Sequence, residues 1–132
     1  MRKLVLLVLL SFIISSIGFD SYASRSDVVT PMFTNIDYFT SNIQIDDNNV
    51  AYVQTSVIAR NVDKIVIEMV LQRFENGTWK TAKSWIHTTF GTEAFSSNSV
   101  VVVKEYKYRL LSNVSIYKGN NLIEKTNNCI DS

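Results

Sequence analysis

The stretch from Ile65 to Ile86 has the sequence IVIEMVLQRFENGTWKTAKSWI and predicts a β-hairpin. In its first half every second residue is apolar (Ile65, Ile67, Met69, Leu71), which is typical of a strand that buries one face. The dipeptide Asn76-Gly77 follows, and it fits the two positive φ angles of a two-residue type I′ turn. The hairpin therefore predicts antiparallel β-structure in the middle of the chain, from which the other strands can be assigned.

The strand pairing of this hairpin follows by counting outward from a two-residue turn. One face then pairs Phe74 with Trp79, Gln72 with Thr81, Val70 with Lys83 and Glu68 with Trp85. The other face pairs Leu71 with Ala82, Met69 with Ser84 and Ile67 with Ile86. The second set is more apolar, so we predict that it faces the core and that the first set faces outward.

The composition of the remaining chain also favours strands. From residue 24 onward, Val, Ile and Thr together number 33, whereas Leu and Ala number eight. β-Branched side chains suit a pleated sheet better than a helix. We predict strands at 33–38, 41–46, 49–60, 63–74, 78–88, 99–104, 107–117 and 121–128, with a loop at 89–98 and loose chain from Asn127. The predicted fold is a Greek-key β-sandwich of seven or eight strands over residues 33–128, with a C-terminal tail at 129–132.

The N-terminus has the three parts of a secretory signal peptide. Met1-Arg2-Lys3 is positively charged, an apolar run reaches Phe19, and Ser21-Tyr22-Ala23 supplies small residues before a cut between Ala23 and Ser24. The apolar run is shorter than the roughly 20 residues that a membrane-spanning helix needs. We therefore predict a signal peptide at 1–23, a flexible segment at 24–32 and a secreted domain that leaves the membrane.

A resemblance to known domains rests on Val102 and Tyr108. Val102, followed six residues later by Tyr108 at the start of a strand, is similar to the tyrosine corner of immunoglobulin-like and fibronectin-like domains. The fibronectin-type pattern usually has Pro or Gly in the intervening turn, where this chain has Lys104 and Glu105. The resemblance implies an immunoglobulin-like sandwich in which Tyr108 is buried and bonds backbone upstream.

A second resemblance covers most of residues 33–125. It joins Leu71-Gln72, Asn76-Gly77, Trp79 and Trp85 to a C-terminal pattern that includes Tyr108-Arg109-Leu110, Ile116-Tyr117, Gly119 and Leu122-Ile123-Glu124. The chain resembles an uncharacterised family of small secreted proteins from Gram-positive bacteria. Its shared motifs are structural, so the resemblance implies an origin and a fold but no catalytic residue.

The residues that carry chemistry are few. The one histidine, His87, is predicted to be a solvated strand-end residue on the outer face opposite Val66. Asp46-Asp47-Asn48-Asn49 offers oxygen ligands, but the run lacks EF-hand spacing and is also an ordinary turn sequence. Cys129, the one cysteine, is predicted to be a spectator on the tail, with an intermolecular disulfide as the alternative. We predict no catalytic centre, no metal and no cofactor.

The predicted function is that of a secreted, non-catalytic binding or structural module, extracellular or associated with the cell wall. Its candidate binding face consists of Phe74, Trp79, Lys83, Trp85 and Glu68, because exposed aromatic residues among polar ones can stack on sugars or anchor a protein. The alternative for this face is a purely structural Phe74–Trp79 pair, with Trp85 covered by another segment.

The expected partner is a protein or carbohydrate of the envelope or medium, and the domain is expected to be a monomer. The net charge of +1 argues against nucleic acid and anionic membranes. The alternative function is a small secreted effector, either an antimicrobial protein or an inhibitor of an exported enzyme.

The signal peptide makes a direct prediction. N-terminal sequencing of the protein recovered from the culture medium should begin at Ser24. Recovery of the uncut chain in the membrane fraction would contradict it.

Overall fold

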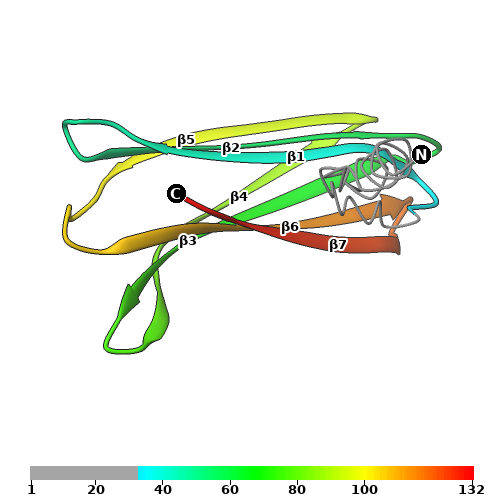
Figure 1. The fold of residues 1–132 in the computed structure, drawn as a ribbon. Helices are drawn as coiled ribbons and strands as arrows, with labels where there is room; N and C mark the ends of the chain where they lie inside the picture. Colours follow the sequence, from blue (N-terminus) through cyan, green and yellow to red (C-terminus); the bar gives the residue numbers. More distant parts are fainter. Residues whose placement is uncertain (1–32) are drawn as a thin grey trace, which may run out of the picture. The chain divides into compact units, whose positions relative to one another are not determined.

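Seven antiparallel strands form two sheets that enclose a common hydrophobic core (Figure 1). The computed structural model describes residues 33–132, so the predictions for the signal peptide, the Ala23–Ser24 cut and the segment 24–32 lie outside the described residues. The strands are β1 (Ile36–Ile45), β2 (Val50–Ala59), β3 (Lys64–Glu75), β4 (Thr78–Phe90), β5 (Glu93–Val101), β6 (Lys107–Lys118) and β7 (Asn121–Asp131). One sheet has the order β1-β2-β5 and the other the order β4-β3-β6-β7.

The core is built by the predicted alternation along the central strands. Ala51, Val53, Thr55, Val57 and Ala59 of β2 are buried, as are Ile65, Ile67, Met69 and Leu71 of β3. Strand β6 contributes Leu110, Val114 and Ile116 from the same sheet as β3. The prediction of which residues on β3 face the core is therefore confirmed, and β2 follows the same period of two, which assigns alternate side chains to one face.

The β3–β4 hairpin has the predicted turn but a different register beyond it. Asn76 and Gly77 both have positive φ, and Phe74 pairs with Trp79 and Gln72 with Thr81 as predicted. The next residue of β4, Ala82, then has no partner, because Leu71 pairs with Lys83. This bulge overturns every predicted pair beyond it, since one extra residue moves all later side chains to the opposite face.

The predicted loop at 89–98 is wrong. Strand β5 occupies Glu93–Val101 and pairs with β2 along its whole length, from Ile58 opposite Glu93 to Val50 opposite Val101. The strand predicted at 99–104 accordingly begins and ends earlier. The Ser- and Asn-rich sequence suggested a turn, but Ser96 is buried on the inner face and accepts a hydrogen bond from Asn98 Nδ2 at 3.2 Å.

Both ends of the described chain are more regular than predicted. Instead of two strands at 33–38 and 41–46, this part of the chain forms the single strand β1 from Ile36 to Ile45, with a bulge between Ile36 and Tyr38. The prediction of loose chain from Asn127 and a tail at 129–132 is also wrong, because β7 pairs with β6 as far as Asp131. Cys129 therefore lies on an edge strand, opposite Leu111, and is exposed.

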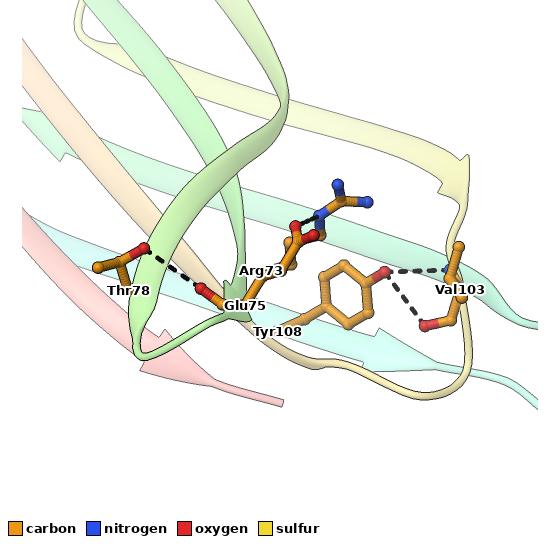
Figure 2. A network of polar contacts seen from close by, with 5 residues as sticks. All are labelled: Arg73, Glu75, Thr78, Val103 and Tyr108. Atoms are coloured by element: carbon orange, nitrogen blue, oxygen red, sulfur yellow. Dashed lines mark hydrogen bonds and ion pairs between the residues drawn. The ribbon is translucent and has the colours of Figure 1, made fainter.

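Tyr108 ties the start of β6 to the connection that leads into it. Its ring is buried, at 3% exposure, and its hydroxyl accepts a hydrogen bond from Val103 N at 3.0 Å and donates one to Val103 O at 3.1 Å (Figure 2). One phenol thus satisfies both backbone groups of a residue between the two sheets. This is the geometry expected of a corner tyrosine.

Four polar side chains link the sheets through the core. Ser41 and Thr55 belong to the three-stranded sheet, and Ser112 and Asn128 to the other. Thr55 Oγ1 lies 2.8 Å from Ser112 Oγ, and Ser41 Oγ lies 2.9 Å from both Ser112 Oγ and Asn128 Oδ1. In residues 33–132 no buried side-chain nitrogen or oxygen lacks a hydrogen-bond partner. The network therefore connects the sheets without leaving a buried polar group unsatisfied.

Removal of the Tyr108 hydroxyl should weaken the fold measurably. We expect Tyr108→Phe to lower the free energy of unfolding by about 1–2 kcal/mol, because the Val103 N–H loses its partner and the Val103 C=O keeps only the 3.5 Å bond from Tyr106 N. Tyr38→Phe is the control, since Tyr38 is 49% exposed, and should change stability by less than about 0.5 kcal/mol. Equal stability of the two variants in urea denaturation would show that the Tyr108 hydroxyl contributes nothing.

Candidate functional site

The outer face of the four-stranded sheet carries an aromatic cluster near the β3–β4 turn, which we call the Trp79 cluster and define as Phe74, Trp79, Gln72 and Arg109. The Phe74 and Trp79 rings lie 5.2 Å apart between centroids and are tilted by 56°. The Arg109 guanidinium lies over the Trp79 ring, 4.1 Å from its centroid, and Arg109 Nε donates to Gln72 Oε1 at 2.8 Å. The cluster therefore joins three adjacent strands.

The arrangement offers three kinds of contact to a ligand. Phe74 is 40% exposed and presents an apolar surface beside the half-buried Trp79. The guanidinium that stacks on Trp79 is fixed by the Gln72 amide, so its charge is held in one place. Fixed aromatic, cationic and amide groups cost little side-chain entropy when a ligand binds.

Of the five residues predicted for the binding face, three lie on the outer face and two do not. Phe74 and Trp79 lie together, and Glu68 lies on the same outer face, where it accepts a hydrogen bond from Asn113 Nδ2 at 2.9 Å. Lys83 and Trp85 do not join them, because the bulge at Ala82 pairs them with the core residues Leu71 and Met69. The predicted exposed site at Trp85 is therefore wrong.

Arg109 was missed because its position depends on β6 lying beside β3. The signal in the sequence is indirect: Tyr108 and Leu110 are core residues, so Arg109 between them must face outward. Only the pairing of Arg109 with Gln72 places it beside the hairpin. Counting from the turn could not supply that pairing.

Ion pairs and turns near this end of the hairpin are structural. Arg73 Nε donates to Glu75 Oε2 at 2.9 Å, and Thr78 Oγ1 donates to Glu75 O at 3.2 Å (Figure 2). Arg73 also lies over the Tyr106 ring, 5.0 Å from its centroid. These contacts hold the hairpin end next to the β5–β6 connection.

Trp85 and His87 lie on the inner side of β4. We call this side of the sandwich, where β4 and β5 are the edge strands of the two sheets, its open side. Trp85 is half-buried against the core, whereas Ile86, on the outer face, is 70% exposed. His87 pairs with Ile67, so the predicted position opposite Val66 is wrong; its Nε2 lies 3.0 Å from Thr89 Oγ1. A hollow of about 410 Å³ between β4 and β5 is lined by Trp85, Ile86, His87 and residues 95–98.

The acidic run at the β1–β2 connection forms a turn. Asp46 Oδ1 accepts hydrogen bonds from Asn48 N and Val50 N, both at 2.9 Å, and Asn49 has a positive φ of 61°. One carboxylate oxygen of Asp46 thus serves the backbone of its own loop. Across residues 33–132, no three His, Cys, Asp or Glu residues lie together as a metal site would require.

The chain matches no protein-family model, and neither the comparison with curated proteins nor that with solved structures gives a match. Residues 33–132 contain no helix of the length and apolar character needed to cross a membrane.

The two neighbours Trp85 and Ile86 test the observed register. We expect Trp85→Ala to cost about 3 kcal/mol of unfolding free energy, because Trp85 packs against the core. Ile86→Ala, one residue further on the opposite face, should cost less than about 1 kcal/mol, because little burial is lost. The reverse order of stabilities in chemical denaturation would restore the register predicted from the turn.

Proposed function

We propose that the protein is a secreted, non-catalytic binding module with an immunoglobulin-like fold, extracellular or associated with the cell wall of a bacterium. The fold assignment is supported by Tyr108 at the start of β6 and by the separation of β1, β2 and β5 from β3, β6 and β7. In the immunoglobulin constant-type arrangement the fourth strand belongs with the first, second and fifth, whereas here β4 pairs with β3. Secretion is supported by the sequence of residues 1–23.

The Trp79 cluster is the observation that carries the binding role. Tryptophan and arginine are enriched among the residues that carry most of the binding energy of protein interfaces. The ring of Phe74, which is 40% exposed, also offers an apolar surface on which a sugar ring can pack. The contact of Arg109 with Trp79 at 4.1 Å fixes both groups before a ligand arrives. A protein or a carbohydrate of the envelope or medium is therefore the expected ligand.

The experiment compares the secreted protein with two variants. The wild type is incubated with purified cell walls and with concentrated medium of the producing bacterium, and the bound fraction is measured. We expect Trp79→Ala to weaken binding about thirtyfold or more, as for a central interface tryptophan. Leu122→Ala, which changes an exposed residue at the other end of the same sheet, should bind as the wild type does.

Two outcomes would contradict the binding role. Equal binding by Trp79→Ala and wild type would remove the cluster as the site. Inhibition of bacterial growth or of an exported enzyme by the wild type would favour the effector alternative instead.

A further inference from the structure

The free edge of β5 differs from the other three sheet edges in residues 33–132. Strand β4 is bulged at Ala82 and carries Lys80 and Lys83, and the edge strands β1 and β7 also contain bulges. Bulges and charges are the usual means by which an edge is kept from pairing with another chain. Strand β5 pairs with β2 without any shift in register, and its one charged residue is Glu93 at its start. It is a straight edge that lacks these protections.

Two hydrogen bonds show which backbone groups of β5 are free. Ala59 N donates to Thr92 O at 2.8 Å, and Val102 N donates to Asn49 O at 2.7 Å. Thr92 and Val102 flank β5, so the even-numbered residues between them direct their N–H and C=O groups toward β2. The N–H and C=O groups of Phe95, Ser97 and Ser99 therefore point away from β2, along the free edge.

The hollow of about 410 Å³ lies beside this edge, over the inner face of β4. A three-stranded sheet faces a four-stranded one, and Trp85 on β4 remains half-buried although it packs against the core. Phe95, 57% exposed, and Asn98 line the hollow from β5. The free backbone groups and the half-buried Trp85 thus line the same hollow.

We propose that the β5 edge binds an extended, uncharged peptide segment of another polypeptide, which adds as a fourth strand to the β1-β2-β5 sheet. Its backbone would bond to Phe95, Ser97 and Ser99, and its inward side chains would fill the hollow against Trp85. Backbone bonds give such strand addition its affinity, and the pocket for alternate side chains gives its specificity. If two whole copies joined through β5, their β4 strands would lie on the same face of the joined sheet and would compete for the space beside the hollow. A single strand does not meet this obstacle and is therefore the better fit.

This site is separate from the Trp79 cluster, so the two proposals are tested independently. Hydrogen exchange of the ¹⁵N-labelled secreted protein is measured by NMR, with and without a peptide of alternating valine and threonine that is solubilised by two terminal lysines. Without peptide, the amides of Ser96 and Asn98 should be protected, while those of Phe95, Ser97 and Ser99 exchange freely. With peptide, these three should become protected by about tenfold or more.

The variant Ser97→Pro removes one outward N–H and leaves the bonds to β2 intact, so peptide affinity should fall about tenfold, the equivalent of one backbone hydrogen bond. The matched control Ser97→Ala keeps the N–H and should bind as the wild type does. Ser99→Pro is the second variant if Ser97→Pro does not fold. Trp79→Ala should leave peptide binding unchanged.

Four results would overturn the proposal. The first is the absence of peptide-dependent protection, and the second is undiminished binding by a folded proline variant. The third is protection of the three amides without peptide at every protein concentration, which would mean that the chain covers its own edge. The fourth is protection that grows with protein concentration alone, which would assign the edge to a second copy.

Discussion

The residue Ala82, which has no partner in β3, determines where the side chains of β4 lie. Before it, Trp79 shares the outer face with Phe74; after it, Trp85 pairs with Met69 on the core side. Without this extra residue, Trp85 would lie outside and Ile86 inside. The bulge therefore separates the two tryptophans, one into the Trp79 cluster and the other into the open side of the sandwich.

The sequence predicted the turn and the core because strong local signals specify both. The type I′ turn requires two positive φ angles, which Asn76-Gly77 adopts more readily than most dipeptides. The apolar alternation along β3 allows only one of its two faces to be buried. The sequence of β4, TWKTAKSWIHTTF, has no such alternation of apolar and polar residues. In the structure, every one of its residues is exposed or half-buried. Nothing in this sequence distinguishes Ala82 from its neighbours, so the pairing predicted from the turn is correct as far as Thr81 and wrong beyond Ala82. Strand β5 was missed for the related reason that polar Ser96 faces the core.

Contacts between strands that are far apart in the chain could not be predicted from the sequence. Thr55 and Ser112 occupy core-facing positions where apolar side chains are expected, and their 2.8 Å contact is formed between the two sheets. Ser41 and Asn128 extend this contact to β1 and β7. A buried hydroxyl without a partner would destabilise the fold by about 1–3 kcal/mol, so each member of the network depends on the others being in place. Arg109 was missed on the same ground, because its stacking on Trp79 requires β6 to lie beside β3.

These interactions make the two sides of the sandwich unequal. On the β1–β7 side, side chains link the sheets: Ser41 contacts Asn128, and Asn35 N, just before β1, donates to Glu124 Oε2 at 2.9 Å. On the β4–β5 side the chain crosses from one sheet to the other through Gly91 and Thr92, and a hollow lies between the strands. Since β4 extends a four-stranded sheet opposite a three-stranded one, its inner residues lack a strand to pack against. The same bulge that directs Trp85 inward therefore places a large apolar side chain where the fold itself supplies too little cover, next to the edge strand best able to accept another strand.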